Sequence, residues 1–398
     1  MYSQIISAQS LYAVMTQEEH RNYGHGKDKE TMLTEIQKTC VDKLYDGSYR
    51  FCLALHDVLC INAHPYGSVE YLCQDILIRK LSVNIMHSYR LKPTNRNLIV
   101  RQIKQLLGTE TPLCIMRKDV RHFFESVNPA EVLMKMRKDG RVGSQTIQLC
   151  ETLMHCATNL GAVGVPRGLA ISSALTEFLM HKFDHTFIKL PDTLLYNRYV
   201  DDIIMISTNR CDMDAVQRLV DESLGAVGLV ENKDKRYSLT YEEWTSGMEF
   251  EYLGYSFVYT DNGIKVKIAE KKLNRIKTRI TRAFKDFIKT GDEQMLFDRM
   301  QFLACISYVK SSSLNKVKVG LPANYSATTG CDSFKEIDCY YQNILHCKNG
   351  AFGHKLQTSL STLYRDKLKR ICFAHCYEHR IRRKFSGVRI HELKDCWR

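Results

Sequence analysis

The chain has 398 residues, enough for two or three domains, and its hydrophobic (44%) and charged (25%) fractions are ordinary for a globular protein. Its formal net charge of +13 favours an anionic partner, most often nucleic acid. It has no run of 18 apolar residues and no basic start followed by an apolar stretch, which argues against a spanning helix and a secretory signal. Its 15 cysteines, with no Cys-x-x-Cys pair, fit reduced thiols in a cytosol.

Hydrophobic periodicity predicts both helices and short strands. In chain order we expect helices over 67–107, a strand over 111–118, helices over 129–160 and 169–190, and a hairpin over 193–208. Two more short strands are expected within 248–268, on either side of a turn at 261–263.

A strongly basic helix is predicted from residue 270 onward. Apolar residues recur there at spacings of three and four, and the opposite face is basic. Residues 265–289 hold ten Lys and Arg against two acids, a local charge of +8, which favours a surface that tracks phosphates. The nucleic-acid-binding candidates on this helix are Lys271, Lys272, Arg275, Arg279 and Arg282.

Potential metal ligands also gather near the C-terminus. Cys372, His375, Cys376 and His379 fall at helical spacing on one face. Structural zinc sites favour tighter knuckles, so ordinary packing is the preferred interpretation, and metal binding stays open.

The predicted hairpin carries two adjacent carboxylates, Asp201 and Asp202, at its tip. Side by side they repel each other, and neither strand needs them, but such a turn can hold hard divalent cations. Asp119 ends the 111–118 strand, and we expect this strand to lie beside the hairpin so that three carboxylates converge. Such convergence is what two-metal phosphoryl transfer requires.

Five segments, in this order, resemble the motifs of reverse transcriptases. They are Asp119–Phe124, Gly164–Gly168 followed by Ile171–Ser173, Tyr199–Asp202 (Tyr-Val-Asp-Asp), Gly228–Leu229 with Asn232 and Lys235, and a primer grip of Tyr252, Leu253, Gly254 and Tyr255. The resemblance implies an α+β right-hand polymerase with an antiparallel palm sheet and a helical thumb and tail.

The resemblance also implies an RNA-directed DNA polymerase, a nucleotidyltransferase. Asp119, Asp201 and Asp202, helped by the Val120 carbonyl, would ligate two Mg²⁺ ions, with Mn²⁺ as the alternative. A primer 3′-hydroxyl would then attack an incoming deoxynucleoside triphosphate, and pyrophosphate would leave.

Nucleotide contacts follow from the same resemblance. Phe124 would block a ribose 2′-hydroxyl and so select deoxynucleotides, with either Phe123 or Phe124 expected to be core packing. Lys235 would lie near the leaving phosphates, and the triphosphate contacts would come from Arg96, Arg101 or Arg117. Arg167 stands where the second motif commonly has Gln, and would grip a phosphate or a sugar edge.

Outside these motifs, residues 80–107 and 302–345 resemble bacterial reverse transcriptases of the abortive-infection, defence-associated (unknown-group) family. That implies a cytoplasmic antiphage protein with a noncoding RNA as template or scaffold, a DNA product and no membrane. A second polymerase or a second copy of the chain would be a further partner. Retron and group II intron enzymes fit less well.

Two other functions stay open. One is a template-independent or protein-primed DNA polymerase, which the unusual Arg167 keeps in view. The other is an RNA-binding scaffold with a dispensable palm, against which the three intact carboxylates argue. For each of these functions, the polymerase included, we expect an N-terminal region and fingers over 1–115, a palm over 116–263 with a finger insertion around 128–160, a helical thumb over 264–345 and a helical extension over 346–398.

Overall fold

The computed structural model describes residues 2–24, 26–92, 94–109, 111–235, 237–241, 246–310 and 316–397. Helices and antiparallel strands are mixed, which confirms the expected α+β class. The chain forms two compact units, one from residues 1–94 and 112–242 and the other from 95–111, 243–311 and 316–398. In the described parts of the chain, none of the helices is long and apolar enough to cross a membrane.

The first unit is built around α5 (Val69–Ser88), a long helix that packs against α10 (Ala170–Ile188). More than half of α5 is buried, so the helix lacks a polar face. Around it lie the short helices α1 (Ala8–Tyr12), α2 (Gln17–Tyr23), α3 (Lys29–Ile36), η1 (Gln37–Val41) and α4 (Asp42–Tyr45), the hairpin β1 (Leu53–His56) and β2 (Leu59–Asn62), and the helices α8 (Pro129–Asp139) and α9 (Ser144–Asn159).

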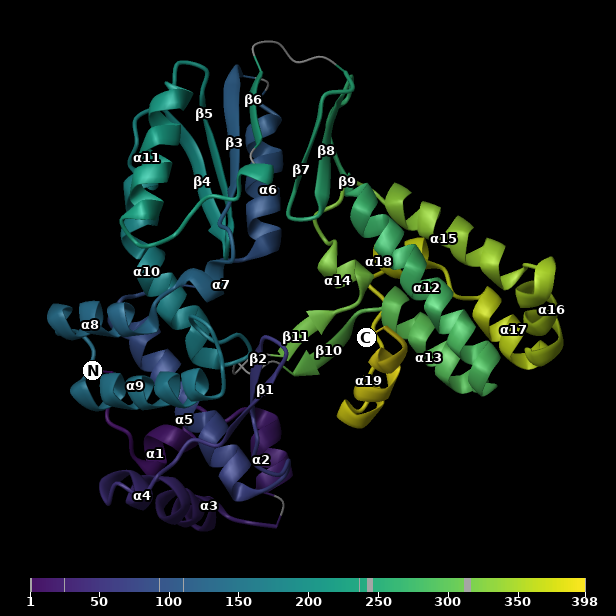
Figure 1. Ribbon diagram of the computed structural model, residues 1–398. Helices are drawn as coiled ribbons and strands as arrows, with labels where there is room; N and C mark the ends of the chain where they lie inside the picture. The colour runs from purple at the N-terminus through teal and green to yellow at the C-terminus, as the bar shows by residue number, and fades with distance from the viewer. Residues whose placement is uncertain are drawn as a thin grey trace. The chain divides into compact units, whose positions relative to one another are not determined.

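A four-stranded antiparallel sheet completes this unit, in the order β4-β5-β3-β6. Its strands are β3 (Leu113–Asp119), β4 (Thr193–Tyr199), β5 (Asp202–Thr208) and β6 (Tyr237–Tyr241). Helix α10 and helix α11 (Met213–Gly225) lie beside the sheet (Figure 1). A short α-helix, α7 (Phe123–Ser126), follows β3, and a short 3-10 helix, η2 (Lys233–Lys235), follows α11.

The expected hairpin over 193–208 is present, but its turn lies one residue earlier than predicted. The turn residues are Val200 and Asp201, and Asp202 is already the first residue of β5, paired with Tyr199. The two catalytic candidates of the tip therefore differ in setting, because one belongs to the turn and the other to a strand.

The second unit contains a three-stranded antiparallel meander and the C-terminal helices. The strands are β7 (Glu249–Tyr252), β8 (Tyr255–Thr260) and β9 (Gly263–Ile268), one more than we predicted in this stretch. The other elements are α6 (Arg96–Leu107), α12 (Glu270–Thr290), α13 (Glu293–Ala304), β10 (Ser307–Lys310), β11 (Lys316–Val319), α14 (Leu321–Asn324), α15 (Asp332–Leu345), α16 (Gly350–Ser359), α17 (Thr362–Lys369), α18 (Phe373–Glu378), α19 (Gly387–Lys394) and η3 (Asp395–Trp397).

Candidate active site

The sheet of the first unit brings the three acidic candidates to one end. Asp119 is the last residue of β3 and stands opposite Asp202, the first residue of β5. The Val120 N–H donates to the carbonyl of Asp201 at 3.0 Å, which ties the hairpin turn to the end of β3. The expectation that these two strands are neighbours is confirmed.

Two of the three carboxylates are held by basic side chains. Lys235 donates from Nζ to both oxygens of Asp119, and Asn232 donates to Oδ1 of the same carboxylate at 3.1 Å. Arg117 donates from Nε and Nη2 to Oδ1 of Asp202 at 3.1 and 2.9 Å. Arg117, predicted to contact a triphosphate, is therefore engaged with a catalytic candidate.

The charges at this end of the sheet influence one another. Burial raises the pKa of Asp201, and the nearby carboxylates of Asp119 and Asp202 raise it further. The hydrogen bond to Asp119 raises the pKa of Lys235. Acidic groups that repel one another and attract cations are suited to a multivalent cation.

The carboxylates share an end of the sheet but are not gathered into a finished metal site. In the described ranges no three His, Cys, Asp or Glu side chains are placed together to hold an ion. The strand register thus brings the three carboxylates to one end of the sheet, as we predicted. Two of them are paired with basic side chains, Asp119 with Lys235 and Asp202 with Arg117. The donor set itself, carboxylate oxygens on adjoining strand ends, fits hard divalent cations.

The same finding applies to the C-terminal cysteines and histidines. Cys372 donates its thiol to Asp338 at 3.2 Å, and the Sγ of Cys376 lies 3.8 Å from that of Cys305. The two cysteines pack within the second unit, whereas His375 and His379 are exposed, and no zinc site is formed from the described residues.

The turn that carries Asp201 has an unusual backbone. Val200 has φ of 61°, in the left-handed region that a β-branched residue seldom adopts. Such a conformation costs about 1–3 kcal/mol and persists only where neighbouring contacts impose it. The turn is therefore held in place by its surroundings and not by local preference.

A cleft of 700 Å³ opens beside the carboxylates. Its lining includes Asp119 and Asp201 together with basic side chains, as a site for a triphosphate requires. The basic side chains are Arg121, His122, Arg167, Lys233 and Lys235. We predicted Arg167 and Lys235 but missed Arg121 and His122, which lie within the first motif, and Lys233, which lies between Asn232 and Lys235.

Phe123 is among the residues that line this cleft, whereas Phe124, the predicted sugar-selecting residue, is not. Phe123 is buried and Phe124 half-buried. The Arg167 guanidinium lies 5.4 Å from the centre of the Phe124 ring and pairs with Glu125 at 2.8 Å. Arg167 thus contacts the predicted sugar-selecting ring in addition to lining the cleft.

The glycine-rich segment passes so close to α7 that Gly164 has no room for a side chain. Gly164 has φ of 68°, and a Cβ there would lie 2.4 Å from the Phe124 carbonyl oxygen. The Val165 N–H donates to that same carbonyl at 2.9 Å. A residue with a side chain could not approach α7 so closely.

The predicted primer grip lies in the second unit, at the turn between β7 and β8. Leu253 and Gly254 both have positive φ, as a tight two-residue hairpin turn requires, and the flanking Tyr252 and Tyr255 are buried. Arg96 donates from Nε and Nη2 to the Leu253 carbonyl at 2.9 and 2.6 Å. Arg96, which we predicted as a triphosphate contact, holds this turn through its guanidinium.

The basic helix is present as α12, with Leu273, Ile276, Ile280 and Phe284 on its buried face. Lys271, Arg275, Arg279 and Arg282 are exposed. Lys272 is half-buried, and its aliphatic stem covers Gly254. Burial lowers the pKa of Lys272, and the charges of Arg275, Arg96, Lys271 and Arg279 lower it further.

No curated protein matches the chain. Among solved structures it is similar to apo telomerase from Candida tropicalis (14% identity, 85% of this chain, 62% of that chain, TM-score 0.40) and to that telomerase with a TWJ fragment of telomeric RNA (15%, 80%, 53%, 0.42). It is also similar to telomerase from Candida albicans with a TWJ fragment of telomeric RNA (14% identity, 80% of this chain, 53% of that chain, TM-score 0.38). The chain spans less than two thirds of the length of each of these telomerase chains.

The family comparison covers the segment in which the acidic candidates lie. Residues 58–257, half of the chain, match the family described as reverse transcriptase (RNA-dependent DNA polymerase). The matched segment contains Asp119, the glycine-rich turn and the Tyr-Val-Asp-Asp hairpin. The chain belongs to the reverse transcriptase family.

Proposed function

We propose that the chain is an RNA-directed DNA polymerase whose catalytic residues are Asp119, Asp201 and Asp202. The observation that carries the proposal is the register of β3 and β5, which sets Asp119 opposite Asp202 with Asp201 in the adjoining turn. The family match to residues 58–257 supports it.

In the proposed reaction, a primer 3′-oxygen bonds to the α-phosphorus of a deoxynucleoside triphosphate, and its proton passes to solvent water. The bond from that phosphorus to the bridging oxygen breaks, and pyrophosphate leaves. Two divalent ions, Mg²⁺ or Mn²⁺, would stabilise the attacking and leaving oxygens when bound. The three carboxylates and the Val120 carbonyl would hold them.

The cationic lining of the cleft would bind the triphosphate. Lys235 keeps its proton beside Asp119, and can pass that proton to the leaving pyrophosphate. Arg121, His122 and Lys233 supply further positive charge at the same cleft. Phe124 would exclude a ribose 2′-hydroxyl from the sugar position, aided by the contact with Arg167.

The second unit would bind the nucleic acid. The α12 face would contact the backbone of an RNA–DNA hybrid through Lys271, Arg275, Arg279 and Arg282, with little sequence readout. Tyr252–Tyr255 would form the primer grip. In this proposal the fingers, palm and thumb occupy the ranges expected from the sequence.

The finer assignment is a bacterial defence-associated enzyme acting in the cytoplasm with a noncoding RNA, alone or with a second polymerase or a second copy of the chain. Its support is the resemblance of residues 80–107 and 302–345 to that group. Sequencing the nucleic acid that co-purifies with the full chain tests this assignment.

Incorporation of labelled deoxynucleotides by the purified chain, on its bound RNA and on an added RNA template with a DNA primer, tests the activity. We expect templated product, and none from the variant with both Asp201→Ala and Asp202→Ala. Asp261→Ala, in the β8–β9 turn, is the matched control and should leave synthesis unchanged. Product from the double variant would overturn the site, and a product sequence unrelated to the template would favour untemplated synthesis.

A further inference from the structure

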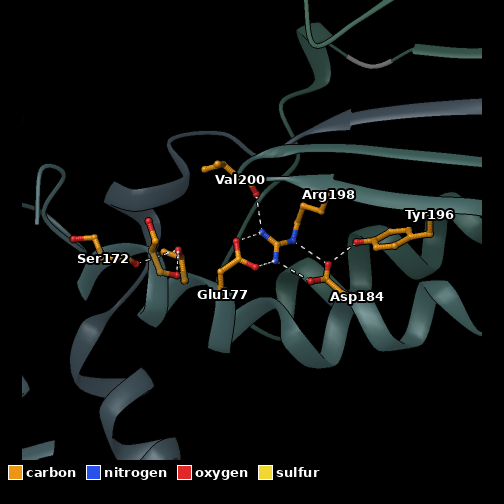
Figure 2. A network of polar contacts seen from close by, with 8 residues as sticks. Ser172, Glu177, Asp184, Tyr196, Arg198 and Val200 are labelled. Atoms are coloured by element: carbon orange, nitrogen blue, oxygen red, sulfur yellow. Dashed lines mark hydrogen bonds and ion pairs between the residues drawn. The ribbon is translucent and has the colours of Figure 1, made fainter. Parts of the chain in front are cut away.

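We propose that Arg198, a buried arginine behind the candidate site, is the positioning residue for the turn that carries Asp201, an inference that rests on the proposed function. Arg198 lies on β4, and its side chain is 3% exposed. It donates from Nη1 to the carbonyl of Val200 at 3.0 Å. Figure 2 shows the guanidinium between this carbonyl and two carboxylates.

The two carboxylates, Glu177 and Asp184, come from α10. They are seven residues apart, about two helical turns, and therefore lie on the same face. Arg198 pairs with Glu177 at 2.6 Å and with Asp184 at 2.8 Å. Tyr196 donates its hydroxyl to Asp184 at 2.6 Å, which fixes the outer end of the network.

All five N–H donors of the guanidinium are accounted for. Nε donates to Asp184, Nη1 to Glu177 and to the Val200 carbonyl, and Nη2 to both carboxylates. A planar arginine can satisfy this set, but a lysine has only three donors on one atom. The hydrogen bond to Val200 therefore belongs to a network in which every guanidinium N–H group has an acceptor, and two carboxylates of α10 hold the guanidinium in place.

Both carbonyls of the hairpin turn are bound. The Val200 carbonyl accepts from Arg198, and the Asp201 carbonyl accepts from the Val120 N–H. Val200 is also the residue in the left-handed region, so the turn needs an external constraint to keep this backbone. Arg198 supplies that constraint from inside the protein. By fixing the backbone of the turn, it also determines the position of the Asp201 side chain.

The test compares Arg198→Lys with Arg79→Lys. Arg79 is also a buried arginine of the first unit, and it likewise bonds a carboxylate, Glu19, and a backbone carbonyl, that of Val14. Both variants should lower thermal stability. Only Arg198→Lys should lower kcat, by about 10- to 100-fold, because misplacing a reacting group by an ångström costs that much. The KM for deoxynucleotide should stay within about threefold.

A second measurement does not depend on polymerase activity. Amide hydrogen exchange over residues 196–203 should speed up in Arg198→Lys and stay unchanged in Arg79→Lys. Adding Val200→Gly to Arg198→Lys should recover part of the lost kcat, because glycine adopts positive φ without help.

The outcomes separate the two proposals. Wild-type exchange at the turn in Arg198→Lys, or equal losses of kcat in both lysine variants, would overturn the positioning role. Faster exchange at the turn in a chain whose wild type makes no DNA would uphold the structural role of Arg198 and overturn the proposed function instead.

Discussion

Lys235 donates from Nζ to both carboxylate oxygens of Asp119, at 2.9 Å each. The two side chains differ in setting, because the Asp119 side chain is 5% exposed and that of Lys235 is 54% exposed. The carboxylate is therefore fixed at the end of β3, whereas the lysine reaches it from the open side of the cleft. Such a lysine can leave the carboxylate when a multivalent cation or a phosphate competes for either partner.

Replacing this lysine should separate its two roles. Lys235→Met should lower kcat by about 100-fold if the lysine donates a proton to pyrophosphate. It should also lower the Mg²⁺ concentration needed for half-maximal activity, because the competing cation on Asp119 is gone. Steady-state kinetics across a Mg²⁺ titration measure both quantities.

Two variants serve as controls for Lys235. Lys233→Met removes a neighbouring charge that also lines the cleft, and should raise the KM for deoxynucleotide with little change in kcat. Lys235→Arg keeps the charge and should retain more kcat than Lys235→Met. A Lys235→Met enzyme with normal kcat and a raised KM would show that the lysine only binds substrate.

Sugar selection should depend on Phe124 and not on Phe123. Phe124→Val should raise the incorporation of ribonucleotides relative to deoxynucleotides by about tenfold or more, because the ring that excludes the 2′-hydroxyl is removed and such a steric discrimination is worth about 1–2 kcal/mol. Phe123→Leu, at the buried neighbour, should lower the melting temperature and leave the selection ratio unchanged. Competition between ribo- and deoxynucleotides in one reaction measures the ratio, and the reverse pattern would assign the selecting ring to Phe123.

The backbone of the candidate site could be predicted because its signals are local. The apolar run ending at Asp119 is a strand buried at nearly every position, and the two runs around Val200 and Asp201 form the hairpin. The spacing of apolar residues in α12 likewise gives its buried face. In each case a short stretch of sequence determines both the element and the face that it buries.

The side-chain partners could not be predicted, because they join residues far apart in the chain. Arg117 and Asp202 are 85 residues apart, and Arg96 and Leu253 are 157 apart. A sequence motif names the residue type at a position but not the group it contacts. Nothing in the sequence marks Arg198 either, since its carboxylates lie on another element.

Arg96 should stabilise the second unit and should not bind nucleotide. It bonds the Leu253 and Asn324 carbonyls and lies 4.8 Å from the centre of the Tyr255 ring. Arg96→Met should lower the free energy of unfolding by about 2 kcal/mol, the scale of hydrogen bonds to a charged group. The KM for deoxynucleotide should not change. Gln105→Met, at an exposed position of the same helix, should affect neither, and a large rise in KM with Arg96→Met would support the triphosphate role.

The exposed face of α12 should make additive contacts to phosphates. Lys271, Arg275 and Arg279 are spaced by four residues and so lie along one side of the helix. Replacing one of them with Gln should reduce the slope of log K against log salt by about 0.7–0.9, the value for one lost phosphate contact. Lys289→Gln, in the last turn of the helix, is the control. Equal slopes for all variants and the wild type would remove α12 from the nucleic-acid interface.

Binding at this face should also depend on pH through Lys272. The pKa of this lysine lies below its ordinary value, because burial and the neighbouring cations disfavour its charged form. A bound phosphate backbone favours the charged form, so binding takes up a proton at alkaline pH. Affinity should fall as pH rises through the lowered pKa, and Lys272→Met should flatten that fall.

Rising pH weakens nucleic-acid binding through Lys272, but in the absence of nucleic acid it increases the stability of the folded chain through the same residue. The unfolded chain holds the Lys272 proton to higher pH than the folded chain does, so this group makes the folded state more stable as pH rises from its lowered pKa towards 10.5. The difference in unfolding free energy between wild type and Lys272→Met should therefore shift in favour of the wild type with rising pH. A difference that stays constant, together with a pH-independent affinity, would mean that Lys272 does not titrate in this range.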